Sequence, residues 1–199
     1  MLTINHLKKC FRKKEVLVDI NLSVGASELV YIKGANGSGK STILKIIGGI
    51  IEKDSGEVSI DPNITIGGLI ENPGFIENET MLYNLNYLAS LTGSLDKSYV
   101  EKLCQLLKMD LNSKMKMKNY SVGMRQKAGI IQAIMENQQL ILLDEPTRGL
   151  DRESADTFNE LIGQLVTEGK SILLISHEEY PTLNFTQQYE LVDGRLSPL

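Results

Sequence analysis

Hydrophobic positions along this chain switch between the spacing of strands and that of helices. Short aliphatic runs predict strands at residues 16–18, 20–24, 29–32, 57–60 and 64–69. We expect the first two of these strands to pair with each other. The run at 42–47 has helical character and ends at Gly48 and Gly49, which are typical of a helix terminus.

The middle of the chain has a helical pattern. Met81, Leu85 and Leu88 recur at helical spacing. Ser98 followed by Glu101 predicts a capping box at the start of a second helix. We therefore expect a helical insertion from residue 72 to about residue 120.

The second half is predicted to alternate helices with apolar strands and to finish in a hairpin turn at Asp193-Gly194. In chain order we expect a helix from Ser121 to about Asn137, a strand at 140–143, a helix around 158–166 and a strand at 171–175. Strands that are apolar throughout are typical of a parallel sheet covered on both faces. The sequence therefore predicts an α/β fold with a mostly parallel sheet, an N-terminal β region and a helical insertion.

Composition narrows the classes of function. The 199 residues suffice for one domain with a sizeable core, and a formal net charge of −4 gives no reason to expect nucleic-acid binding. The N-terminus lacks a signal-peptide pattern, and no apolar run approaches the roughly 18 residues that a membrane helix needs. Cys10 and Cys104 have no metal-ligand spacing, so we interpret them as reduced thiols of a cytosolic protein. A path across a membrane would have to come from another chain.

Residues 34–41 match the phosphate-binding pattern G-x-x-x-x-G-K-[ST] between a predicted strand and a predicted helix. Glycines let backbone N–H groups turn toward phosphate oxygens, and the helix N-terminus adds positive potential. Lys40 is placed to reach the β- and γ-phosphates, and the Ser41 hydroxyl to ligate Mg²⁺. The expected nucleotide contacts are Gly34, Ala35, Asn36, Gly37, Ser38, Gly39, Lys40, Ser41 and Thr42. Alone, this motif indicates only an NTPase or a kinase.

Two acids, Asp144 and Glu145, follow the apolar strand at 140–143. Ligands of open α/β sheets gather at the carboxyl ends of the strands. Asp144 is therefore expected near Mg²⁺, and Glu145 where it can take a proton from an attacking water. An acidic strand end that merely caps the next turn is the alternative, which the upstream phosphate loop disfavours.

These two motifs, together with the sequence Tyr-Ser-Val-Gly-Met-Arg-Gln at 120–126, resemble the ABC ATPase family. Segment 120–126 resembles the family's signature motif, 149–151 its D-loop and 176–178 its switch-histidine segment. The motifs follow the family's order and spacing over nearly the whole chain. The resemblance implies ATP and Mg²⁺ as ligands and a P-loop NTPase core.

The resemblance also assigns roles to residues outside the phosphate loop. It implies that Ser121 and Gly123 grip the γ-phosphate of an ATP held by a second subunit, and that Asp151 lies at that interface. Ser121 is expected to cap its helix as well. His177 would contact the γ-phosphate and align Glu145 with the water. Phe11 would stack on adenine, with packing in a hydrophobic pocket as the alternative.

Some positions depart from the family pattern. Glu71 replaces the usual glutamine after the strand at 64–69, and its carboxylate can still ligate Mg²⁺ while adding negative charge near the phosphates. Val122 and Met124 stand where the common signature has Gly and Gln. These departures resemble ATPases of bacterial peptide-antibiotic and drug exporters, including the bacitracin-resistance type. We also expect no C-terminal regulatory domain after the hairpin.

The resemblance implies a single ABC ATPase domain over residues 1–199, with 1–71 and 126–199 as nucleotide-binding core and 72–125 as helical signature subdomain. A homodimer or heterodimer would act on the cytoplasmic face of the membrane beneath an integral membrane permease. The permease would dock beside residues 71–80. Phe75, Tyr83 and Tyr87 are candidate contacts unless they fill the insertion's own core. A cluster of basic residues lies near the N-terminus. We expect it at an exposed, solvated edge, with contact to anionic lipid as the alternative. Its members are Lys8, Lys9, Arg12, Lys13 and Lys14.

Three alternatives remain at this point. The first is a non-transport ABC ATPase acting on ribosomes or DNA, although no nucleic-acid partner is expected. The second is a P-loop kinase or GTPase. The third is an assembly component that binds ATP but scarcely hydrolyses it.

Overall fold

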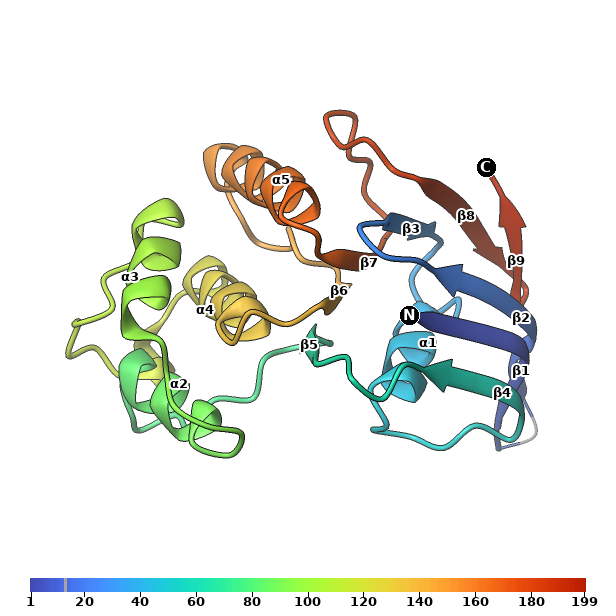
Figure 1. Ribbon diagram of the computed structural model, residues 1–199, viewed down its shortest axis with the longest axis horizontal. Coiled ribbons are helices and arrows are strands. Elements are labelled where there is room, and N and C mark those ends of the chain that lie inside the picture. The colour runs from blue at the N-terminus through green and yellow to red at the C-terminus, as the bar shows by residue number, and fades with distance from the viewer. Residues whose placement is uncertain (13) are drawn as a thin grey trace.

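The computed structural model describes residues 1–12 and 14–199, so Lys13 of the basic cluster lies outside the described residues (Figure 1). One sheet comprises β1 (Leu2–Phe11), β2 (Lys14–Val24) and β4 (Ser55–Ile60). The other comprises β3 (Leu29–Lys33), β5 (Ile66–Leu69), β6 (Leu140–Asp144), β7 (Ser171–Ser176), β8 (Gln187–Val192) and β9 (Arg195–Pro198). The helices are α1 (Lys40–Ile47), α2 (Met81–Ala89), α3 (Lys97–Leu106), α4 (Val122–Ile134), α5 (Arg152–Thr167) and the short 3₁₀ turn Met117–Asn119.

The larger sheet has the order β5-β6-β7-β3-β8-β9, and the smaller has the order β2-β1-β4. Strands β5, β6, β7, β3 and β8 run parallel, and β9 returns antiparallel to β8. Asp193 and Gly194 between them both have positive φ, 47° and 73°, as a tight hairpin turn requires. The predicted α/β class, parallel sheet, antiparallel N-terminal region and hairpin are confirmed.

Both faces of the parallel sheet are covered. Side chains along its strands point alternately into two hydrophobic cores, one on each face of the sheet. On β6, Ile141 and Leu143 join the core formed with α2 to α5. Leu140 and Leu142 join the core shared with α1 and the antiparallel sheet. Figure 1 shows α1 between the two sheets, with α2 and α3 gathered at the opposite end of the molecule.

Residues 16–18 and 20–24 do not form a pair of strands, so that expectation is wrong. They belong to the continuous strand β2, whose partner is β1 at the start of the chain. Register shifts between the pairs Ile4/Leu22, Leu7/Ile20 and Lys9/Leu17 interrupt the ladder. These irregularities break the simple alternation of buried and exposed positions, so one strand resembled two in the sequence.

The predicted capping box at Ser98 is also wrong. The N-cap of α3 is Asp96, whose carboxylate accepts a hydrogen bond from the backbone N–H of Tyr99. Ser98 lies inside the first turn. Asp and Ser are comparably good N-caps, so two candidates two residues apart could not be separated by pattern alone.

Helix α4 packs directly on β5 and so joins the helical insertion to the sheet. A side chain at Gly67 could not fit, because its Cβ would lie 1.8 Å from the carbonyl oxygen of Ala133. Helix α4 passes through residues 125 and 126, the predicted boundary between core and helical subdomain. Among the described residues, no helix combines the length and apolar character needed to span a membrane.

Candidate functional site

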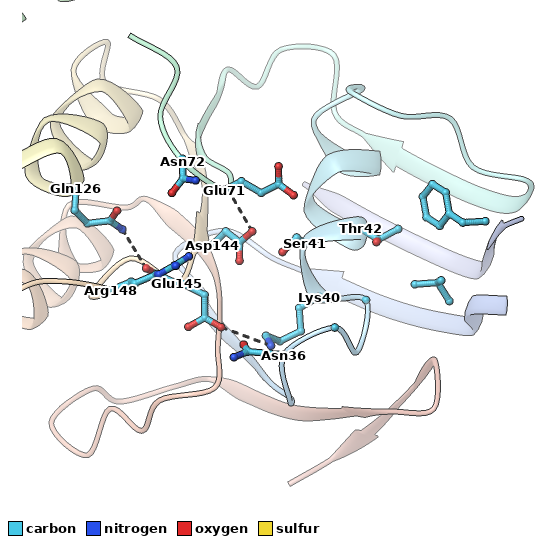
Figure 2. Close-up of a pocket in the computed structure, with 14 residues that line it drawn as sticks. Asn36, Lys40, Ser41, Thr42, Glu71, Asn72, Gln126, Asp144, Glu145 and Arg148 are labelled. Atoms are coloured by element: carbon cyan, nitrogen blue, oxygen red, sulfur yellow. Dashed lines mark hydrogen bonds and ion pairs between the residues drawn. The ribbon is translucent and has the colours of Figure 1, made fainter. Parts of the chain in front are cut away.

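A cavity of about 570 Å³ opens where α1 begins and β6 ends (Figure 2). Its walls come from the loop after β3, the acids at the end of β6 and the residues after β5. The lining residues are Phe11, Val16, Asn36, Gly37, Gly39, Lys40, Ser41, Thr42, Glu71, Asn72, Gln126, Asp144, Glu145 and Arg148. The predicted phosphate loop and the predicted acids therefore meet in one place.

The loop before α1 has the shape of an anion cradle. Gly37 and Gly39 have φ of 80° and 105°, values that residues with side chains rarely adopt. Lys40 is only 5% exposed, and its ammonium donates to the carbonyls of Gly34 and Ala35 at 2.6 and 3.0 Å. The Ser38 hydroxyl is buried and has no partner within the part of the chain that the structure describes. A phosphate group in this loop would match both the cation and the unpartnered hydroxyl.

Asp144 and Ser41 offer hard oxygen ligands at the base of the cavity. Asp144 is 4% exposed and accepts the backbone N–H of Glu71 at 3.3 Å. Burial raises the pKa of Asp144, an effect that the Ser41 hydroxyl and the Glu71 N–H partly offset. Within the described residues, no group of three or more His, Cys, Asp or Glu side chains forms a metal cage. This set fits Mg²⁺, which is typically bound by few protein oxygens together with water and substrate phosphates.

The Glu71 side chain does not point at this oxygen pair. Its carboxylate forms an ion pair with Lys45 of α1 and turns away from Asp144 (Figure 2). The contact of residue 71 with Asp144 is made by its backbone N–H instead. Lys45 was missed in the sequence, where it reads as an ordinary exposed helical lysine.

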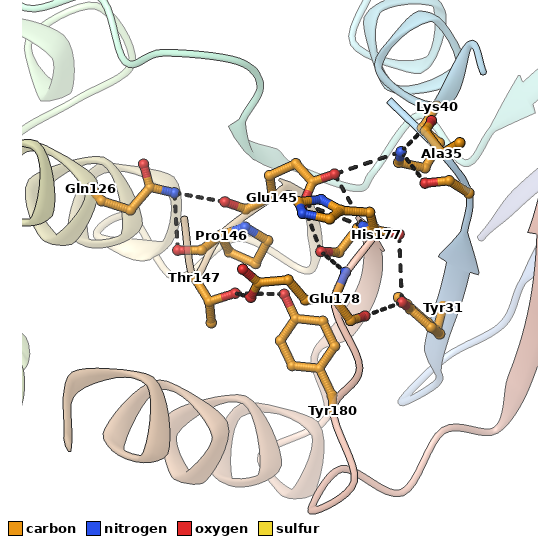
Figure 3. Close-up of polar contacts among 12 residues, drawn as sticks. Tyr31, Ala35, Lys40, Gln126, Glu145, Pro146, Thr147, His177, Glu178 and Tyr180 are labelled. Carbon is orange, nitrogen blue, oxygen red and sulfur yellow. Dashed lines mark hydrogen bonds and ion pairs between the residues drawn. The ribbon is translucent and has the colours of Figure 1, made fainter. Parts of the chain in front are cut away.

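Glu145 is held by the last residue of β7 and the residue that follows it (Figure 3). Its Oε2 accepts from the Ser176 hydroxyl at 2.7 Å and lies 2.8 Å from Nδ1 of His177. Its Oε1 accepts the His177 backbone N–H at 3.1 Å and lies 3.6 Å from the Lys40 ammonium. Burial pushes the pKa of Glu145 up, but the hydrogen bonds from His177 and Ser176 outweigh burial and lower it overall. Glu145 is therefore a carboxylate at neutral pH and able to accept a proton.

Gln126 is a site residue that sequence reasoning missed. This buried side chain of α4 donates from Nε2 to the carbonyls of Glu145 at 3.0 Å and Pro146 at 2.9 Å. It fixes the main chain where Glu145 adopts a positive φ of 47°. In the sequence, the signal for Gln126 was its position in segment 120–126, which resembles the signature motif. That resemblance does not predict the contact with the carbonyls of Glu145 and Pro146.

The three residues predicted to contact a second subunit's nucleotide, Ser121, Gly123 and Asp151, do not line the cavity. Ser121 caps α4 by accepting the Met124 N–H at 3.2 Å, as expected. Asp151 caps α5 by accepting the Ser154 N–H at 2.8 Å. A Cβ at Gly123 would lie 2.8 Å from the carbonyl oxygen of Gly149, so the signature-like and D-loop-like segments touch.

Phe11 stands at the rim of the cavity. Its side chain is 43% exposed, so it is not packed within a hydrophobic pocket. The Lys9 ammonium lies 5.3 Å from its ring centroid. A planar ligand can reach the exposed part of the ring.

The cradle, its buried lysine and the two acids at the end of β6 define a P-loop nucleoside-triphosphate-binding domain. The family profile described as ABC transporter matches residues 17–148. The chain therefore belongs to the ABC transporter family, and its resemblance to this family is confirmed. Membership of this family excludes the alternative that the chain is a P-loop kinase or a GTPase.

The chain is similar to several curated ABC transporter ATP-binding proteins. It is 31% identical to the lantibiotic transport ATP-binding protein SrtF of Streptococcus pyogenes, with 89% of this chain and 80% of SrtF covered. It is 33% identical to the bacitracin transport ATP-binding protein BcrA of Enterococcus faecalis, with coverages of 86% and 59%. An uncharacterized ABC transporter ATP-binding protein of Bacillus subtilis, YdbJ, is 33% identical with coverages of 89% and 61%. The chain thus spans less than two thirds of the length of YdbJ and BcrA.

Solved structures show the same fold. A structure described as an ATP-binding subunit of an ABC transporter aligns with a TM-score of 0.87 and 26% identity, covering 98% of this chain and 88% of that one. The dimeric bacterial ABC transporter cassette MJ0796 aligns with a TM-score of 0.89 and 24% identity, covering 98% and 96%.

Proposed function

We propose that this chain binds ATP with Mg²⁺ and hydrolyses the ATP as the ATPase subunit of an ABC transporter. The observation that carries this proposal is the position of the Glu145 carboxylate, held by His177 and Ser176 beside the buried Lys40. Glu145 accepts a proton from the attacking water while His177 keeps the carboxylate in place. Lys40 and the loop N–H groups stabilise negative charge on the phosphates. Asp144 and Ser41 hold Mg²⁺, which offsets phosphate charge when bound.

We further propose that two subunits, identical or different, enclose two ATP molecules. Ser121, Gly123 and Asp151 lie outside the cavity of their own chain, so a nucleotide held by a second subunit would be their ligand. The N-terminus of α4, capped by Ser121, has the polarity that suits a phosphate. The structure of the similar cassette MJ0796 is described as dimeric, which supports this arrangement.

The proposed membrane partner is an integral permease that docks beside residues 71–80. Phe75 is buried and belongs to the core, whereas Tyr83 and Tyr87 are each 50% exposed and do not fill it. Ile76 and Leu91 are also exposed apolar side chains close to these tyrosines in sequence, and the exposed Ile50 lines a second cavity together with Pro73 and Gly74. The named lantibiotic and bacitracin transport relatives favour export of a peptide antibiotic, drug or similar compound. This assembly places the chain in the cytoplasm, against the inner face of the membrane.

Pull-down of the tagged protein from its native cells in mild detergent tests this assignment. We expect a multi-spanning membrane protein to co-purify in near-equal amount. The same preparation of a strain carrying only the tag serves as the control. Recovery of ribosomes or DNA, with ATPase activity intact, would favour the non-transport alternative. Recovery of the permease with an inactive ATPase would favour the assembly component.

Replacing Glu71 with glutamine should leave the ATP hydrolysis rate within about an order of magnitude, because the exposed pair with Lys45 contributes little energy. The backbone N–H that contacts Asp144 is also retained. Steady-state hydrolysis measured across Mg²⁺ concentrations checks this, and loss of a negative charge from the cavity lining should alter the Mg²⁺ dependence. Glu79→Gln, a half-buried acid of the same segment that does not line the cavity, is the matched control. Complete loss of hydrolysis in Glu71→Gln alone contradicts the expectation.

A further inference from the structure

Buried hydroxyl groups hold the segment that carries His177. We call residues 176–180, which comprise the last residue of β7 and the segment after it, the His177 loop. The Tyr31 hydroxyl of β3 donates to the main-chain carbonyl of Glu178. The Thr147 hydroxyl donates to the Glu178 carboxylate, with 2.6 Å between Oγ1 and Oε2. Figure 3 shows these hydroxyls approaching different ends of Glu178.

The Thr147 hydroxyl belongs to a directed chain of hydrogen bonds. The Tyr180 hydroxyl lies 2.8 Å from Thr147 Oγ1. Since Thr147 has one hydroxyl proton and gives it to Glu178, the proton in the second bond comes from Tyr180. Burial raises the pKa of Tyr180 to about 12, so its hydroxyl keeps this proton near neutral pH. The chain therefore runs from Tyr180 through Thr147 to the Glu178 carboxylate.

Aromatic packing aims these hydroxyls. Tyr31 and Tyr180 are 3% and 6% exposed. The Tyr31 ring stacks on Phe185 with centroids 4.8 Å apart and meets the Tyr180 ring edge-on at 5.9 Å. Side chains packed this closely keep their rotamers, so the hydroxyl positions are fixed before any ligand binds.

The His177 loop reaches the proposed base through several donors. Ser176 Oγ accepts the Glu178 backbone N–H at 3.0 Å and donates to Glu145 at 2.7 Å. The His177 ring and backbone N–H contact the same carboxylate. A displacement of Glu178 would therefore move the donors from Ser176 and His177 together.

We propose that Tyr31 and Thr147 are positioning residues for hydrolysis, which hold Ser176 and His177 against Glu145 by fixing Glu178. This inference rests on the proposed ATPase function of the same site. Thr147 also lies in the segment that leads from Glu145 toward Asp151, so its hydroxyl ties the His177 loop to that segment. Loss of either hydroxyl should slow turnover without weakening nucleotide binding.

Thr147→Val and Tyr31→Phe remove these hydroxyls with little change in shape. We expect kcat for ATP hydrolysis to fall by about 10- to 100-fold in each, as a small misplacement of reacting groups produces. KM for ATP should stay unchanged, because binding is retained. Thr147→Ser keeps the hydroxyl and should hydrolyse ATP like the unmodified protein. Tyr99→Phe, a half-buried tyrosine of α3, is the control for losing a phenolic hydroxyl.

Nuclear magnetic resonance of the imidazole nitrogens gives a second readout that needs no activity. The chain has two histidines, and His6 serves as an internal reference because its Nδ1 lies 2.9 Å from Asp19, away from this network. Thr147→Val and Tyr31→Phe should shift the His177 signals and leave those of His6 in place. Unchanged His177 signals, or unchanged kcat in an active protein, would overturn the proposal. Shifted His177 signals in a protein without ATPase activity would support the positioning role and refute the proposed function instead.

Discussion

Replacing Lys40 with alanine should abolish tight ATP binding. The ammonium is almost fully buried within the loop, and the carbonyls of Gly34 and Ala35 aim it at the cavity. A hydrogen bond to a charged partner is worth roughly 1.5–3 kcal/mol, so its loss should raise the ATP dissociation constant about 10- to 100-fold. The variant also leaves those two carbonyls without their donor, which disturbs the loop itself.

Titration calorimetry with ATP and Mg²⁺ measures this effect. Lys40→Arg separates charge from shape, because the guanidinium keeps the positive charge but is planar and longer than the ammonium. We expect it to bind more weakly than the unmodified protein. Lys53→Ala removes an exposed lysine that does not line the cavity and should bind normally. An unchanged dissociation constant in Lys40→Ala would show that the phosphates bind elsewhere.

The phosphate cradle and the acidic pair could be predicted because their geometry is local. The loop's conformation depends on glycines that are contiguous with Lys40, and Gly37 and Gly39 take the positive φ that glycine permits. Asp144 and Glu145 could be placed from a general rule for strand ends in parallel sheets. Both motifs lie at the carboxyl ends of strands in one parallel sheet, so their proximity could be predicted without knowing any side-chain contact.

Contacts between segments distant in the sequence could not be predicted. Lys45 meets Glu71 across 26 residues, and Gln126 meets the Glu145 carbonyl across 19. Each contact depends on how α1 or α4 is oriented against the sheet, which hydrophobic periodicity does not encode. For the same reason, the contacts of the Tyr31 and Thr147 hydroxyls could not be predicted. These hydroxyls reach the His177 loop from β3 and from the segment after Glu145.

Replacing Glu145 with glutamine should preserve ATP binding but slow hydrolysis by roughly 100-fold or more, the usual contribution of a general base. The amide has the size of the carboxylate and can still accept a hydrogen bond from Ser176, yet it cannot take a proton from water. It also removes a negative charge 3.6 Å from the Lys40 ammonium, next to the phosphate site, so ATP binding should not weaken. If the two-subunit site is right, ATP should then hold the dimer together, because the step that loosens it is blocked.

Light scattering after size-exclusion chromatography, with saturating ATP and Mg²⁺, measures the dimer, and phosphate release measures hydrolysis. Glu160→Gln replaces an exposed acid of α5 and should behave like the unmodified protein. Hydrolysis at the normal rate in Glu145→Gln would remove Glu145 as the base. A variant that binds ATP, does not hydrolyse it and stays monomeric would exclude a homodimeric site. The two subunits would then have to differ, because Ser121 and Asp151 would still need a nucleotide outside their own cavity.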